Sequence, residues 1–106
     1  MEKINVLKFM GVLLVCLLIL MPSVGSNFIS FQGPGCALPG TVIMSCGYCL
    51  PIFENYHSGY SFRYYDGQPA YLYNSDKCEG TPDTELAATT EDCNGFGWSS
   101  IFIQCS

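Results

Sequence analysis

The C-terminal segment of the chain alternates between two kinds of side chain. Residues 98–105 read Trp-Ser-Ser-Ile-Phe-Ile-Gln-Cys. Alternate side chains of an extended strand point to opposite faces, so Ile101, Ile103 and Cys105 share one face. We predict that this face packs into a core and is fixed at its end by a disulfide. The opposite face carries Trp98, Ser100, Phe102 and Gln104.

A second alternating segment spans residues 59–65 and is rich in aromatic side chains. Asp66-Gly67 follows it directly and is a strong signal for a β-hairpin turn, so we predict a return strand that begins at residues 70–73. The aromatic side chains predicted to share one strand face are Tyr60, Phe62 and Tyr64.

Turn signals divide the rest of the chain into short segments, and no segment has a convincing helical pattern. Thr84–Glu91 is predicted to be a loop or a short turn. Short strands spaced in this way predict a small all-β barrel or sandwich in a single domain. The predicted breaks are Gly33-Pro34-Gly35, Pro39-Gly40, Asn74-Ser75-Asp76, Gly80-Thr81-Pro82-Asp83 and Asn94-Gly95.

One sequence element recurs within the chain. Gly59-Tyr60-Ser61 and Gly97-Trp98-Ser99 lie 38 residues apart, and each introduces an alternating strand. Two similar Greek-key units would produce such a recurrence.

The N-terminus has the organisation of a secretory signal peptide. Lys3 and Lys8 precede an uninterrupted apolar run, Phe9–Met21, and small residues suited to cleavage follow. A membrane anchor is the alternative, but spanning a bilayer takes about 20 apolar residues, and this run is shorter. We predict a signal peptide over residues 1–26, cleaved after Gly25 or Ser26, a mature domain over residues 27–106, and an extracellular location.

Removal of the signal peptide changes the charge balance. The mature chain keeps two of the four basic residues, Arg63 and Lys77, and eight of the nine acidic ones, which gives a net charge of −6. Nucleic-acid binding requires several Lys or Arg side chains that neutralise phosphates. The charge balance therefore excludes a nucleic-acid partner.

Cleavage also removes Cys16 and leaves an even number of cysteines: Cys36, Cys46, Cys49, Cys78, Cys93 and Cys105. A hydrophobic core in a domain this small barely offsets the lost chain entropy. Three disulfides in a secreted protein would supply the missing stability, although these residues alone leave the pairing open.

The spacing of Cys46-Gly47-Tyr48-Cys49 also occurs in zinc and redox sites. A zinc site usually needs a second pair of ligands, and no such pair stands at a typical spacing. A thioredoxin-like motif would begin a helix, whereas Leu50-Pro51 follows here. Structural disulfides are the interpretation that we favour.

Catalytic residues are scarce. His57 is the single histidine of the chain, with Glu54 and Arg63 near it in sequence, and in principle these three residues supply the acid, base and phosphate clamp of a small ribonuclease. Their spacing does not favour that arrangement over a solvated loop. We therefore predict no enzymatic activity and no catalytic residues.

Two pairs of acidic residues deserve a separate test as calcium ligands. They are Asp83 with Glu85 and Glu91 with Asp92. Calcium takes six to eight oxygen ligands, and an isolated pair of carboxylates is usually solvated. We predict no metal and no cofactor.

Taken together, the motifs of the mature chain resemble the β-barrelins, plant antimicrobial proteins of the macadamia type. The resemblance extends over almost the whole mature chain. It is strongest in Cys93-Asn94, Phe96-Gly97-Trp98 and residues 100–105, and it includes Gly33-Pro34-Gly35-Cys36, Cys46-Gly47, Gly59-Tyr60, Gly67-Gln68, Leu72-Tyr73-Asn74, and Cys78 with Gly80.

The resemblance implies a disulfide-stapled Greek-key barrel or sandwich like that of the βγ-crystallins, and a non-enzymatic antimicrobial activity directed mainly at fungi. It also implies three disulfides, which are Cys36–Cys93, Cys46–Cys105 and Cys49–Cys78.

Two features depart from the family pattern. The family usually separates its second and third cysteines by one residue, whereas two residues stand between Cys46 and Cys49, and we expect a bulge to absorb the difference. Typical members are basic, whereas this chain is acidic. Because anionic membranes attract cations, we do not expect adsorption to them.

Three functional hypotheses follow. The first is a secreted, monomeric plant defence protein that acts on fungi or oomycetes at a cell-wall glycan. The second is a secreted glycan-binding module without toxicity, and the third is a small hydrolase that uses His57 and Glu54. The resemblance favours the first.

Overall fold

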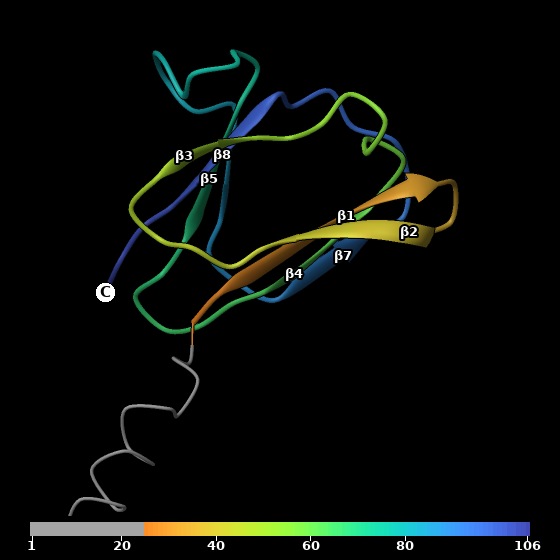
Figure 1. Cartoon of the computed structure of the whole chain (residues 1–106). Helices are drawn as coiled ribbons and strands as arrows, with labels where there is room; N and C mark the ends of the chain where they lie inside the picture. The colour runs from red at the N-terminus through yellow and green to blue at the C-terminus, as the bar shows by residue number, and fades with distance from the viewer. Residues whose placement is uncertain (1–24) are drawn as a thin grey trace, which may run out of the picture.

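Residues 25–106 form two four-stranded antiparallel sheets in the computed structural model, which describes this part of the chain (Figure 1). The strand order is β2-β1-β4-β7 in the first sheet and β3-β8-β5-β6 in the second. The all-β prediction is therefore confirmed. The strands are β1 (Asn27–Gly33), β2 (Ala37–Ile43), β3 (Cys49–Pro51), β4 (Tyr60–Arg63), β5 (Ala70–Tyr73), β6 (Thr84–Leu86), β7 (Thr90–Asp92) and β8 (Ser100–Ile103).

The two halves of the chain build equivalent patterns and exchange one strand each. The first half forms the order β2-β1-β4, and the second half forms the order β6-β5-β8. The remaining strands cross between the sheets, because β3 pairs with β8 and β7 pairs with β4. Neither half completes a sheet without the other.

The core lies between the sheets and consists of nine buried hydrophobic residues. Ile101 and Ile103 are 0% and 1% exposed, as their alternation predicted. The aromatic face of β4 is also confirmed, since Tyr60 and Phe62 are buried and Tyr64 packs against the core. The full set is Phe28, Ile52, Tyr60, Phe62, Ala70, Leu72, Leu86, Ile101 and Ile103.

The predicted orientation of the C-terminal segment is wrong at two positions. Cys105 is exposed, because β8 ends at Ile103 and the alternation stops there. Ser100, which was predicted to lie on the opposite face, is fully buried. Its hydroxyl is satisfied by backbone groups of a neighbouring loop, and a buried hydroxyl is tolerated when it is bonded in this way.

The predicted hairpin at Asp66-Gly67 is also wrong. The chain does turn there, because the Gln68 N–H donates to the Tyr65 carbonyl at 2.9 Å, and Gly67 adopts a φ of 80° that glycine tolerates best. The flanking strands then enter different sheets: β4 lies between β1 and β7, and β5 lies between β8 and β6. A turn sequence fixes the reversal of the chain but not the strands that pair after it.

Two further predictions of irregular structure need correction. Thr84–Glu91 contains β6 and the start of β7. Each of these strands is three residues long, too short to show alternation. The predicted break at Pro39-Gly40 lies inside β2, because β2 is an edge strand, where a missing N–H is tolerated. The β1–β2 register also shifts between Phe31 and Gly33, opposite this segment.

The other four predicted breaks lie in connections between strands, as expected, except that Gly33 is the last residue of β1. The first is the turn between β1 and β2. The other three lie after β5, before β6 and after β7. Glycine, proline and Asx chemistry thus located the turns more reliably than it located the strand partners.

Three disulfides join segments that are distant in sequence. They are Cys36–Cys93, Cys46–Cys105 and Cys49–Cys78, with Cα–Cα distances of 4.9, 5.1 and 5.9 Å. These are the pairs that the family resemblance implied. Because Cys46 and Cys49 bond to different partners, their shared motif is neither a redox pair nor a zinc site.

The additional residue between Cys46 and Cys49 is accommodated in a bend rather than in a bulge of β3. Residues 46–48 form this bend before β3 begins. Gly47 has a φ of 80°, and its N–H donates to the Ile103 carbonyl at 2.7 Å. The bend places Tyr48 on the surface, 66% exposed.

The predicted signal peptide lies, except for its last two residues, outside the described part of the chain. Ser26 belongs to the folded domain and is 1% exposed. Its hydroxyl donates to the Gln68 carbonyl at 2.7 Å and accepts from the Tyr65 N–H at 2.8 Å. Of the two cleavage positions considered, the one after Gly25 retains these bonds. No helix within residues 25–106 is long and apolar enough to cross a membrane.

Candidate functional site

His57 links two loops and is not the solvated side chain that the sequence suggested. Its Nδ1 lies 2.8 Å from the Glu54 carbonyl oxygen, and its Nε2 lies 2.6 Å from the Trp98 carbonyl oxygen. Carbonyl oxygens only accept hydrogen bonds, so the imidazole is the donor wherever it bonds to one of them. His57 therefore joins the loop after β3 to the loop before β8.

An aromatic cluster surrounds the histidine. The His57 ring meets Phe96 edge-on at a centroid distance of 5.0 Å. Phe96 stacks on Trp98 at 5.1 Å, and Trp98 meets Tyr60 at 5.4 Å. Such aromatic pairs each contribute about 0.5–1.5 kcal/mol beyond the burial of area. The cluster consists of Phe28, His57, Tyr60, Phe96 and Trp98.

The proposed hydrolase residues do not assemble. The histidine bonds the backbone carbonyl of Glu54 rather than its carboxylate. Its second nitrogen is occupied by Trp98. A general base needs a free nitrogen within reach of substrate, and His57 has none to offer in this arrangement.

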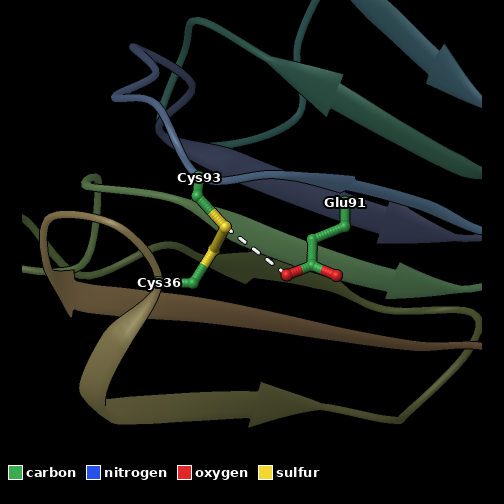
Figure 2. Close-up of side chains that lie close together, drawn as sticks. All are labelled: Cys36, Glu91 and Cys93. Atoms are coloured by element: carbon green, nitrogen blue, oxygen red, sulfur yellow. Dashed lines mark hydrogen bonds between the residues drawn. A yellow bond between two sulfur atoms is a disulfide. The ribbon is translucent and has the colours of Figure 1, made fainter.

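The acidic residue Glu91 lies against a disulfide (Figure 2). Its Oε1 is 3.4 Å from the Cys93 Sγ. Together with Cys36, these side chains form a compact group of three potential metal-ligating residues. Both sulfurs, however, are bonded to each other, so neither is a thiolate ligand and neither carries a proton to donate. The contact is a close approach of a carboxylate to sulfur, and the group is structural.

Gly59 makes room for this disulfide. A Cβ atom at this position would lie 3.1 Å from the Cys36 Sγ and 3.1 Å from the Cys93 Cα. Any larger residue would push the bridge away from the start of β4. The glycine of the Gly59-Tyr60 motif is thus explained by packing.

The acidic pairs considered as calcium ligands are partly used within the fold. The Trp98 indole N–H donates to the Asp83 Oδ2 at 2.8 Å, and Asn74 and Thr84 also donate to this carboxylate. These bonds, led by that of Trp98, lower the pKa of Asp83. The Asp92 carboxylate accepts from Asn94. Asp83 is therefore an acceptor for neighbouring side chains.

A cavity of about 410 Å³ lies between the loop that follows β3 and the loop that precedes Cys78. Its apolar wall includes Phe53, which is 61% exposed. Two acidic residues, Glu54 and Asp76, come from its two sides. The residues that line it are Pro51, Ile52, Phe53, Glu54, His57, Asp76 and Ser99.

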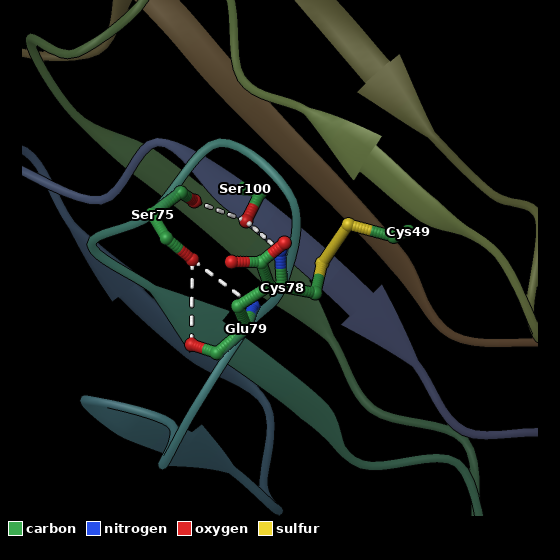
Figure 3. Close-up of a disulfide and its surroundings, with 5 residues drawn as sticks. All are labelled: Cys49, Ser75, Cys78, Glu79 and Ser100. Atoms are coloured by element: carbon green, nitrogen blue, oxygen red, sulfur yellow. Dashed lines mark hydrogen bonds between the residues drawn. A yellow bond between two sulfur atoms is a disulfide. The ribbon is translucent and has the colours of Figure 1, made fainter.

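Covalent and hydrogen bonds hold the 74–80 loop, which carries Asp76, against β3 and β8 (Figure 3). The Cys49–Cys78 disulfide joins β3 to the 74–80 loop. The buried Ser100 hydroxyl accepts from the Cys78 N–H at 3.0 Å and donates to the Ser75 carbonyl at 2.5 Å. The Ser75 hydroxyl in turn accepts from the Glu79 N–H at 3.0 Å. The loop is therefore held in place before any ligand arrives.

Sequence reasoning did not select Phe53 or Asp76. Fourteen aromatic residues in the mature chain gave no basis for choosing an exposed one. One signal was available in retrospect: Pro51 lies two residues after Cys49, and Asp76 lies two residues before Cys78. A disulfide between those cysteines brings the two segments together.

Comparison with known proteins identifies the family. Residues 26–105 match the MiAMP1 family. The chain belongs to the MiAMP1 family. It is 41% identical over 102 residues to Antimicrobial peptide 1 of Pinus monticola, covering 93% of this chain and 95% of that protein. It is 42% identical over 100 residues to Antimicrobial peptide 1 of Macadamia integrifolia, covering 92% and 94%.

A solved structure of the MiAMP1 family has the same fold. The solution structure of MiAMP1, a plant antimicrobial protein, matches with a TM-score of 0.65 and 42% identity, covering 74% of this chain and 99% of that one. The match supports two four-stranded antiparallel sheets with three disulfides. Membership of this antimicrobial family identifies the protein as non-enzymatic.

Replacing His57 with Ala should destabilise the fold and leave antimicrobial activity in place. The variant loses the contact with Trp98 that joins the two loops and the local contact with Glu54, and we expect a loss of about 1–2 kcal/mol in the free energy of unfolding. Denaturant unfolding measures this loss, and the exposed neighbour Asn55→Ala serves as the control. A folded His57→Ala protein that no longer inhibits growth would contradict the structural role.

The bond between Asp83 and Trp98 should respond to acid. Because the folded-state pKa of Asp83 is lowered, the stabilisation is present above the ordinary aspartate value of about 3.9 and is lost as the pH falls through the folded-state value. Trp98 fluorescence should therefore change below the ordinary value, and Asp83→Asn should abolish this change. Asp66→Asn is the control, and a transition at or above the ordinary value would refute the assignment.

Proposed function

We propose that the protein is a secreted plant defence protein that inhibits the growth of fungi or oomycetes without catalysis. The observation that carries this proposal is the identity of 41% and 42% to two proteins named Antimicrobial peptide 1, over nearly the full length of all three chains. Three disulfides in a domain of this size fit an oxidising, extracellular environment. We infer that a signal peptide is removed, because the N-terminus contains the apolar run Phe9–Met21, and cleavage after Gly25 would keep the buried Ser26 in the domain.

The exchange of strands between the two halves supports a finer description of the fold. The two sheets have equivalent strand orders, in which each strand of one half of the chain takes the place of its counterpart in the other half. These orders are β2-β1-β4-β7 and β6-β5-β8-β3. Two intertwined Greek keys of the βγ-crystallin kind would produce this pattern. The Tyr60 and Trp98 motifs introduce the equivalent strands β4 and β8, which supports the same assignment.

The charge of the mature chain favours the cell wall over the membrane as the point of contact. Two cations against eight anions give no attraction to anionic lipid, where each Lys or Arg contributes about 1 kcal/mol. Sugars are bound through aromatic stacking and hydrogen bonds to hydroxyl groups, which need no net positive charge. We therefore propose a wall glycan as the partner, with the protein acting as a monomer. A glycan-binding module without toxicity is the second candidate, because a wall glycan can be bound without harm to the cell.

A growth assay combined with two binding assays tests this proposal. The oxidised mature protein should inhibit fungal growth, should be retained on insoluble fungal-wall glucan or chitin, and should not co-sediment with anionic liposomes. Reduced and alkylated protein is the control for the folded state. Retention without growth inhibition would favour the non-toxic module. Salt-sensitive liposome binding without glycan retention would contradict the wall-directed proposal.

A further inference from the structure

The cavity beside Phe53 has the composition of a small-molecule site. Pockets that bind small molecules are mostly apolar, with a few polar groups that fix orientation, and have volumes of roughly 300–1,000 Å³. This cavity, of about 410 Å³, combines an apolar wall of Pro51, Ile52 and Phe53 with two acidic residues. An exposed aromatic ring at a cavity wall provides a flat surface on which a sugar ring can stack.

The acidic residues of the cavity are available to a ligand. Within residues 25–106, side-chain hydrogen bonds occupy the carboxylates of Asp83 and Asp92. No side-chain hydrogen bond within these residues uses the carboxylates of Glu54 or Asp76, the two acidic residues that line the cavity. His57 also lines it, but its two ring nitrogens are bonded to backbone carbonyls. The cavity therefore offers hydrogen-bond acceptors and negative charge.

The charge of the mature chain also favours cationic sugars. A net charge of −6 repels phosphorylated, sulfated and uronic-acid polymers and attracts cationic ones over a distance of about 8–10 Å at physiological salt. A protonated amino sugar has one apolar ring face and an ammonium group. An aromatic ring binds such a cation favourably, and carboxylates accept its N–H groups.

We propose that this cavity binds the protonated amino sugar of deacetylated chitin. The proposal rests on the proposed function at the cell wall and specifies its ligand. Phe53 stacks on the sugar ring, and Glu54 and Asp76 accept hydrogen bonds from the ammonium group and the hydroxyls. The Cys49–Cys78 disulfide and the Ser100 bonds hold in place the two segments that carry Glu54 and Asp76, so little ordering is needed on binding.

Titration of the mature, oxidised protein with glucosamine oligomers tests the site, with N-acetylglucosamine oligomers of equal length as the comparison. At mildly acidic pH the protein should bind the deacetylated oligomer about fivefold or more tightly than the acetylated one, and added salt should reduce the difference. Amide chemical shifts should change in residues 51–57 and 74–79. The double variant Glu54→Gln, Asp76→Asn should lose the preference, whereas the exposed Glu85→Gln and Asp66→Asn together give a matched change of charge elsewhere.

A second pair of variants separates stacking from charge. Phe53→Ala should weaken binding of both oligomers about two- to fivefold, because the ring no longer buries the apolar face of the sugar. Leu38→Ala, at a residue that is 80% exposed on β2, should not weaken it. All these positions are exposed, so the variants are expected to fold, and their unfolding curves check this.

Three other results would overturn the proposal, and each has a different consequence for the site and for the proposed function. Equal losses in the cavity variant and the matched Glu85/Asp66 variant would show that binding depends on net charge alone. Retention on glucan or chitin without a preference for glucosamine, or unaffected by the cavity variants, would refute this site and leave the proposed function standing. Absence of binding to every wall glycan would overturn both.

Discussion

The three disulfides are the constraint on which the rest of the structure depends. The core contains nine buried hydrophobic residues, and β3, β6 and β7 are each three residues long. Sheets made of such short strands have little independent stability. The bridges span sequence separations of 57, 59 and 29 residues, so each removes considerable freedom from the unfolded chain. The small core suffices because the unfolded state is restricted.

The same bridges determine which surfaces the protein presents. Cys49–Cys78 brings Asp76, which precedes Cys78, to the apolar segment after Cys49 and so forms the cavity. The buried Ser100 hydroxyl then fixes the 74–80 loop through its bonds to Cys78 and Ser75. The fold thus presents acidic and aromatic groups instead of a cationic surface. This chemistry is suited to a neutral or positively charged glycan, which is why the wall rather than the lipid bilayer is the proposed point of contact.

The sequence predicted features that depend on neighbouring residues better than features that depend on distant ones. Alternation located the buried Ile101, Ile103, Tyr60 and Phe62, and turn residues located most connections. The partner of each strand was not predictable. Asp66-Gly67 marks a turn, but β4 and β5, the strands on either side of it, belong to different sheets. The role of His57 was missed for the same reason, because its Trp98 partner lies 41 residues away. The disulfide pairs came from family resemblance, since spacing alone left them open.

Removal of the Cys49–Cys78 bridge is the most direct test of this account. In the Cys49→Ala, Cys78→Ala protein, we expect a loss of about 3–4 kcal/mol in the free energy of unfolding. Amide hydrogen exchange should show the largest loss of protection in residues 50–57 and 74–79, with β1, β4 and β8 still protected. Unchanged stability would contradict the claim that the disulfides support the small core, and a loss of protection no larger in residues 50–57 and 74–79 than in β1, β4 and β8 would contradict the claim that this bridge fixes the cavity.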